Sequence, residues 1–96
     1  MLLFRSFAQN LEGEAYEFPG AFEVAAMGAA DAGIAEALPG LVEAAGAQVL
    51  AGSLRVRESS AGNYVSVSIS FLAADRAQLD AVHESVRSHA GVRWML

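Results

Sequence analysis

Three stretches of the chain alternate between apolar and polar residues, the period that is typical of a strand with one buried face. They are residues 22–27, residues 54–57 and residues 64–71. The turn-forming residues 59–63 separate the second from the third and predict a hairpin. The third stretch is the clearest, because its predicted inner side is wholly apolar: Val65, Val67, Ile69 and Phe71.

Two other stretches have apolar residues at spacings of three and four, the pattern of an amphipathic helix. The first covers residues 31–45, and Asp31 is its expected N-cap. Pro39 lies inside this stretch and removes a backbone hydrogen bond, so we expect either a kink or a break there. The second begins at Asp75, which we expect to cap the helix together with Gln78, three residues further on.

A last strand is expected over residues 92–96, with Val92, Trp94 and Leu96 on the core side. The order of elements is then β-α-β-β-α-β. Right-handed crossovers and the central hairpin select a ferredoxin-like α+β sandwich. This is a four-stranded antiparallel sheet in the order 4-1-3-2, with both helices on one face.

Length and composition fit one small domain, since 96 residues with 54% apolar content can bury a single core. We predict that domain over residues 18–96, behind a flexible leader over residues 1–17. Alternatively, the apolar residues of the leader fold back onto the domain or a partner chain: Leu2, Leu3, Phe4 and Phe7.

The charge of the chain and its lack of targeting signals indicate where the protein is located and which partners are excluded. The chain has no cysteine, no run of about 18 apolar residues and no secretory signal pattern, so we expect a cytoplasmic protein without a membrane partner. The net charge is −5, with six arginines and no lysine, which opposes binding to nucleic acid.

The hairpin loop of residues 59–64 and the strand after it resemble the central motif of the YbeD-like family, small bacterial proteins of unknown function. Phe18-Pro19, Met27-Gly28, residues 78–80 and residues 92–96 add to the resemblance, which covers residues 18–96. It implies an ACT-like, ferredoxin-like fold and no reaction. Ala61 stands where this family usually has a lysine, which weakens any anion-binding role of the loop that needs that charge.

The predicted topology leaves one face of the sheet without helices, and three of the six arginines fall on it. They are Arg55, Arg57 and Arg93, and we expect Arg93 to lie beside Glu23 on the adjacent strand. Three interpretations of this face stay open: a solvated polar surface, a self-association surface, or a site for a small anion or an acidic partner.

Two loops offer further candidate contacts for a ligand. Gly28 precedes a helix N-terminus, where a carboxylate can be held, although the segment can also be a plain connector. The hairpin loop can hold a small anion with its backbone N–H groups and hydroxyls, or can be a turn and nothing more. Its candidate residues are Ser59, Ser60, Gly62, Asn63 and Tyr64.

No combination of residues amounts to a catalytic or metal site. His83 and His89 are six positions apart, which does not suit two ligands on one helix face, and neither has a serine and acid partner in sequence. We therefore predict a non-enzymatic regulatory or adaptor domain without a cofactor. It is expected to act through its sheet, as a homodimer or with a protein partner.

The alternative function is an ACT-like domain that senses a small anion or an amino acid. RNA binding ranks below both. It requires exposed aromatic residues flanked by basic ones, and the predicted open face offers serines.

Overall fold

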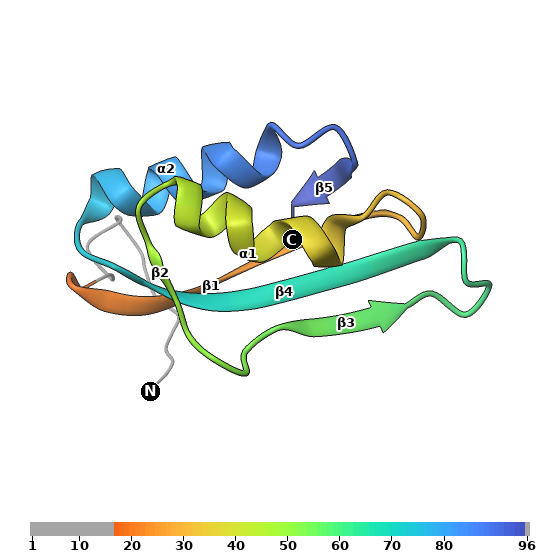
Figure 1. Cartoon of the computed structure of the whole chain (residues 1–96), viewed down its shortest axis with the longest axis horizontal. Coiled ribbons are helices and arrows are strands. Elements are labelled where there is room, and N and C mark those ends of the chain that lie inside the picture. The colour runs from red at the N-terminus through yellow and green to blue at the C-terminus, as the bar shows by residue number, and fades with distance from the viewer. Residues whose placement is uncertain (1–16, 96) are drawn as a thin grey trace.

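The computed structural model describes residues 17–95 of the chain, so the predicted leader, residues 1–17, lies outside the described residues except for Glu17. The elements alternate as the hydrophobic pattern predicts (Figure 1). In chain order they are β1 (Gly20–Ala29), α1 (Ile34–Ala44), β2 (Gln48–Val49), β3 (Arg55–Glu58), β4 (Tyr64–Ala73), α2 (Arg76–Arg87) and β5 (Val92–Met95).

The strands form one antiparallel sheet in which the long strands β1 and β4 are central. β5 pairs with the outer side of β1, and β3 pairs with the first half of β4. Both helices lie on one face of this sheet, as Figure 1 shows. The predicted α+β, ferredoxin-like sandwich with its 4-1-3-2 order is confirmed. The short strand β2, which the sequence pattern did not predict, adds a second segment beside the end of β4.

The core lies between the helices and the covered face of the sheet. Along β4 every second side chain is buried, because residues of one parity all point at the helices. Each large apolar side chain that leaves water contributes about 1.5–3 kcal/mol, far more than an exposed ion pair. The helices supply six of these residues: Ile34, Leu38, Val42, Leu79, Val82 and Val86.

The start of α1 differs from the prediction. The helix begins at Ile34 after Gly33, whose φ is 76°, and no side chain caps it. Asp31 is therefore not the N-cap, because the chain first makes a turn in which the Ala32 N–H donates to the Ala29 carbonyl oxygen at 3.0 Å. The helix then runs through Pro39 as a single element, so the predicted break is not found.

The start of α2 is as predicted, and it ties the two helices together. Asp75 Oδ1 accepts a hydrogen bond from the Gln78 N–H at 2.9 Å, and Gln78 Oε1 accepts one from the Ala74 N–H at 2.8 Å. The Gln78 amide also donates to the carbonyl oxygen of Gly46, which has a φ of 93° and ends α1. One side chain thus joins the end of one helix to the start of the other.

The register of β5 contains a β-bulge that the alternating pattern did not predict. Met27 pairs with Trp94, but its neighbour Gly28 pairs with Val92, so Arg93 is an extra residue between the two pairs. A bulge of one residue reverses the side to which the following side chains point. Trp94 is therefore 49% exposed on the open face, and its predicted place on the core side is wrong.

The same register overturns a predicted contact between charges. Glu23 pairs with Ser70 of β4, whereas β5 reaches only the far end of β1. Arg93 is therefore not the cross-strand neighbour of Glu23. The bulge also turns Met95, which follows Trp94 and pairs with Ala26, towards the core, and its side chain packs there.

Candidate functional site on the open face of the sheet

The face of the sheet opposite the helices carries two separate groups of side chains. We call one the arginine hollow, which is lined by Glu23, Arg55, Val56, Arg57, Ser66 and Ser68. We call the other the aromatic cluster, which consists of Tyr64, Arg93 and Trp94. Two of the three predicted arginines therefore lie together, and the third belongs to a different group.

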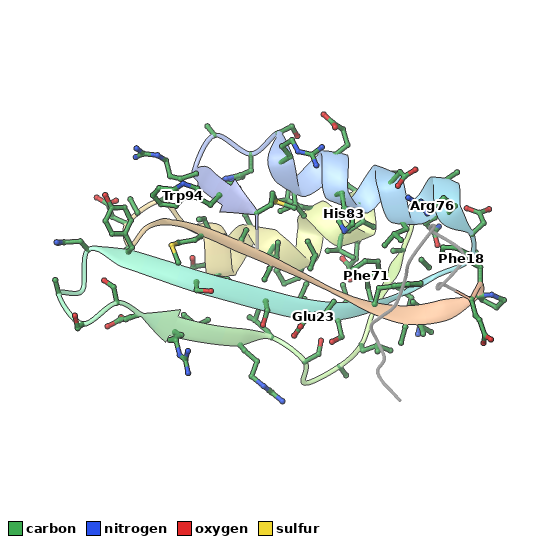
Figure 2. The ribbon with its side chains drawn as sticks, turned by 180° about the vertical axis from the view of Figure 1, so that it is seen from behind. Phe18, Glu23, Phe71, Arg76, His83 and Trp94 are labelled. Carbon is green, nitrogen blue, oxygen red and sulfur yellow. The ribbon has the colours of Figure 1, made fainter. Side chains whose placement is uncertain are left out.

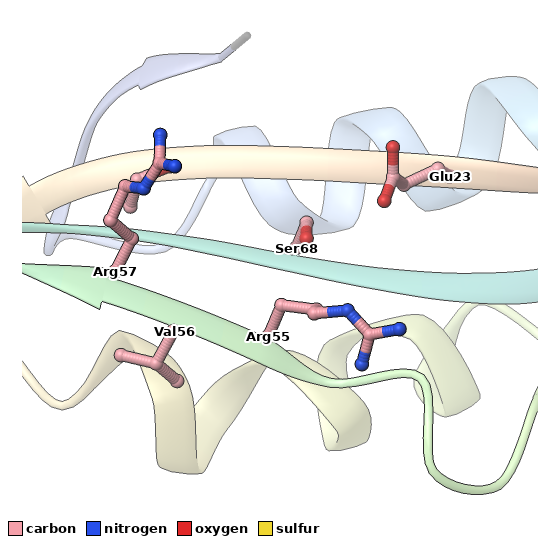
Figure 3. A pocket seen from close by; sticks show the side chains of 6 residues that line it. Glu23, Arg55, Val56, Arg57 and Ser68 are labelled. Carbon is pink, nitrogen blue, oxygen red and sulfur yellow. The ribbon is translucent and has the colours of Figure 1, made fainter.

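The pairing of β3 with β4 places the two arginines of the hollow. Arg55 lies opposite Ser68 and Arg57 opposite Ser66, and paired residues of an antiparallel ladder point to the same side. Figure 3 shows both arginines on one side of β3 and Val56 on the other, with Glu23 across from them on β1. The space between these side chains is an open hollow of about 350 Å³.

The two guanidinium groups of the hollow are available to a ligand. Neither Arg55 nor Arg57 forms an ion pair with a carboxylate among residues 17–95, where the ion pairs are those on α2. A guanidinium presents several N–H donors in a plane, which suits a carboxylate or a phosphate. The chemistry of the hollow therefore suits an anionic group, although the carboxylate of Glu23 also lines it.

The aromatic cluster lies at the end of the sheet where β4 begins and β5 pairs with β1. The rings of Tyr64 and Trp94 meet edge to face, with centroids 5.9 Å apart, and the Arg93 guanidinium carbon lies 5.6 Å from the Trp94 ring centroid. Tyr64 is 39% exposed. In Figure 2, Trp94 and Phe18 mark opposite ends of the molecule.

The sequence did not predict this cluster, because regular alternation was assumed along the whole of β5, whereas the strand has a bulge at Arg93. The expectation that the open face offers serines in place of the exposed aromatic residues that RNA binding requires is therefore wrong. One of the two arguments against RNA binding falls with it, while the net charge of −5 still opposes such binding.

The hairpin loop is held by its own hydrogen bonds. The Ser59 N–H donates to the Tyr64 carbonyl oxygen at 2.9 Å, and the Tyr64 N–H donates to Ser59 Oγ at 3.2 Å. The Gly62 N–H donates to the Ser59 carbonyl oxygen, and Gly62 has a φ of 75°, which favours glycine. Ser60 is exposed in the loop. These contacts are those of a turn, and a role for the loop in anion binding stays a prediction.

The connection after β1 is tightly packed. Gly28 is buried, and a Cβ added to it would overlap the Gly91 carbonyl oxygen and approach the Ile34 side chain. Close packing of backbone therefore accounts for the glycine at this position. Nearby, the Asn63 carbonyl oxygen accepts a hydrogen bond from the Ala30 N–H at 2.9 Å, which ties the hairpin loop to the end of β1.

The titratable groups of α2 lie on the other side of the sheet. His83 is half-buried, and burial lowers its pKa, with a further lowering by the positive charge of Arg87. His89 Nδ1 accepts a hydrogen bond from the Gly91 N–H at 3.0 Å, which gives it a structural role. Within residues 17–95, His, Asp and Glu side chains do not gather in threes that could hold a metal ion.

The helices of the described part, α1 and α2, are too short to span a bilayer.

The comparison with known proteins assigns a family. Residues 14–96 match a family described as a protein of unknown function, DUF493. The chain belongs to this family. A UPF0250 protein from Xanthomonas oryzae pv. oryzae (strain PXO99A) is 47% identical over 81 residues, which are 84% of this chain and 88% of the relative. A UPF0250 protein from Xylella fastidiosa (strain 9a5c) is 42% identical over the same share of each chain. The resemblance to a family of small bacterial proteins of unknown function is confirmed.

One solved structure supports the predicted fold class. The ACT domain from GTP pyrophosphokinase of Chlorobium tepidum superposes with a TM-score of 0.63 and covers 79% of this chain and 94% of its own. Its sequence identity to this chain is 9%, so the likeness concerns the fold alone. The ACT-like arrangement that the family resemblance implied is confirmed.

Proposed function

We propose that this chain is a non-enzymatic regulatory or adaptor domain that binds a protein, a second copy of itself included, through the open face of its sheet. The aromatic cluster carries this proposal. Trp, Tyr and Arg are the residues that supply most binding energy in protein interfaces, and here all three lie side by side on a face without helices.

The exposure of two large aromatic rings also supports a protein-binding function for the open face. Trp94 is 49% exposed and Tyr64 is 39% exposed, although both side chains are large enough to gain from burial. The contacts of the Trp94 ring with Tyr64 and with Arg93 hold the cluster in one arrangement before a partner arrives, which lowers the entropic cost of binding.

The experiment measures association of the full chain with and without the Trp94 ring. Native mass spectrometry at micromolar concentration reports self-association, and capture from a bacterial extract reports other partners. We expect Trp94→Ala to weaken the association by about 30-fold, the effect of a typical interface hot spot.

Leu72→Ala is the matched control, because Leu72 is 39% exposed and its partner in the sheet is Ala21, far from the cluster. The control should associate as the wild type does. A chain that stays monomeric and captures no partner would exclude the proposal. Equal losses for the two variants would exclude the aromatic cluster as the centre of the binding surface.

The arginine hollow supports a second candidate function, the sensing of a small anion. Its specific observation is the pair of guanidinium groups that lack a carboxylate partner among the described residues. A thermal-shift titration with inorganic phosphate should raise the melting temperature of the wild type and leave that of Arg55→Gln/Arg57→Gln unchanged.

Arg87→Gln removes one positive charge from the outer side of α2 and serves as the control for net charge. Sodium chloride at equal ionic strength serves as the control for screening. An equal phosphate shift in all three proteins would rule out binding at the hollow.

A further inference from the structure

The edge of the sheet formed by β3 is open to a further strand. β3 pairs with β4 on one side only, and no segment among residues 17–95 pairs with its other side. Figure 1 shows β3 as the outermost strand of that edge. All four of its residues are exposed. An edge of this kind presents unpaired backbone groups to other chains.

The hydrogen bonds of the hairpin show which backbone groups face outward. The Ser59 N–H donates to the Tyr64 carbonyl oxygen, so Ser59 directs its backbone groups at β4, and bonded pairs alternate with non-bonded pairs along an antiparallel ladder. Arg57 and Arg55 therefore direct their N–H and C=O groups at β4. Val56 and Glu58 direct theirs at the open edge, where a new strand would meet them.

The side chains of β3 differ between its two faces. Arg55 and Arg57 lie on the open face of the sheet. Val56 lies on the opposite face, and it is 53% exposed because the helices do not cover this corner. Leu54, two residues earlier, is 40% exposed. A strand added here would meet two positive charges on one face and exposed apolar surface on the other.

A second copy of β3 does not suit this edge. Symmetric antiparallel pairing centred on Val56 sets Arg55 of one copy against Arg57 of the other. Pairing centred on Arg57 sets that residue against itself. Like charges directly opposite each other are destabilising, so the edge favours a strand of different composition.

We infer that the free edge of β3 binds an extended peptide segment as an added strand, and that it selects segments in which acidic and apolar residues alternate. The acidic side chains pair with Arg55 and Arg57, and the apolar side chains cover Val56 and Leu54. This surface is distinct from the aromatic cluster, so the inference does not rest on the first proposed function. It shares Arg55 and Arg57 with the arginine hollow, and the control peptides below distinguish strand addition from the binding of an anion there.

The test uses the full chain and a fluorescein-labelled peptide with the sequence Thr-Val-Glu-Val-Glu-Val-Thr, followed by fluorescence anisotropy. We expect saturable binding that Arg55→Gln/Arg57→Gln weakens about tenfold, the combined effect of two cross-strand charge pairs. Arg55→Glu/Arg57→Glu should lose this peptide and bind the version with lysine in place of glutamate. Arg87→Gln and Trp94→Ala should bind as the wild type does.

Two control peptides distinguish strand addition from electrostatic attraction between the acidic peptide and the two arginines. One has the same residues with the two glutamates adjacent, which breaks the alternation. The other carries N-methyl groups on the amides that would donate to the edge. Both should bind at least tenfold more weakly. Equal binding of either control peptide, or no binding of the alternating peptide, would overturn the inference.

Discussion

The two faces of β4 show how differently one strand can be constrained. On the covered face, the side chains of Val65, Val67, Ile69 and Phe71 are at most 7% exposed. On the open face, three serines alternate with them and remain partly accessible to solvent. Packing against two helices fixes the chemistry of the first face, while the second is free to carry groups that serve a partner.

Phe71 and Leu72 test this comparison most strongly, because they are neighbours in sequence on opposite faces. Phe71 is 0% exposed and Leu72 is 39% exposed. We expect Phe71→Ala to lower the free energy of unfolding by about 3–5 kcal/mol, and Leu72→Ala to lower it by less than about 1 kcal/mol. Urea denaturation followed by circular dichroism measures both.

If Phe71→Ala leaves too little folded protein, Phe71→Leu gives an intermediate loss that can still be measured. Similar losses for Leu72→Ala and Phe71→Ala would mean that the open face is as tightly packed as the covered one.

The glycines give a second test, because one lies against backbone and another lies in open space. A Cβ at Gly28 would overlap the Gly91 carbonyl oxygen, whereas a Cβ at Gly40 in α1 meets nothing. We expect Gly28→Ala to cost about 1–3 kcal/mol by overpacking. Gly40→Ala should stabilise the protein by about 0.5–1 kcal/mol, because glycine is a poor residue for a helix interior. Thermal denaturation shows whether the two signs differ.

A smaller effect on the free energy of unfolding is expected from the cap at the start of α2. Asp75→Ala removes the side chain that caps α2, and we expect a loss of about 1 kcal/mol in the free energy of unfolding. Asp80→Ala is the control, because the ion pair that Asp80 forms with Arg76 is exposed, and its loss should cost less than about 0.5 kcal/mol. Equal losses in urea denaturation would show that the cap contributes nothing beyond surface charge.

The smallest expected effect is the pH dependence of stability that comes from His83 on α2. Its pKa is lowered from 6.5, first by burial and then by Arg87, with Asp80 opposing and Arg76 adding a little. Below that ordinary value the unfolded chain takes up a proton that the folded chain does not, so acid lowers the free energy of unfolding. The stability gained from the neutral imidazole is complete above pH 6.5 and falls as the pH drops towards the lowered pKa.

Urea denaturation between pH 5 and 7.5 measures this dependence. His83→Gln should reduce its slope, since glutamine does not titrate. An unchanged slope in the variant would assign the dependence to the carboxylates instead.

Much of the fold could be predicted from the sequence, because residues that are buried in the core leave a regular apolar pattern along the chain. The alternation of β4 and the spacing of apolar residues in both helices reflect burial on one side, and burial is what the hydrophobic pattern records. The cap formed by Asp75 and Gln78 was equally predictable, since it depends on residues three positions apart.

The pattern failed where geometry depends on contacts between distant backbone segments. Nothing in the local sequence of β5 marks the extra residue at Arg93, because a bulge is set by how β5 meets Gly28 on the neighbouring strand. The prediction that Asp31 caps the first helix was wrong for a related reason. It is a good capping residue, but the turn that ends β1 begins the helix further along the chain.

The candidate site was predicted in part for the same reason. Arg55 and Arg57 were placed on the open face because the regular hairpin fixes their parity. Trp94 was placed on the wrong face because its parity depends on the bulge. An aromatic residue beside an arginine near a chain end was the available signal, since such pairs are common at interfaces.

The close approach of Gly28 to Gly91 also limits which substitutions this chain tolerates at position 28. The atom that a side chain at position 28 would strike is a main-chain oxygen, and every amino acid possesses one. A second substitution at position 91 therefore offers no compensation. The available escape is a displacement of β5, which would carry Trp94 away from Tyr64, so a glycine on the covered face of β1 helps to fix the geometry of the aromatic cluster on the open face.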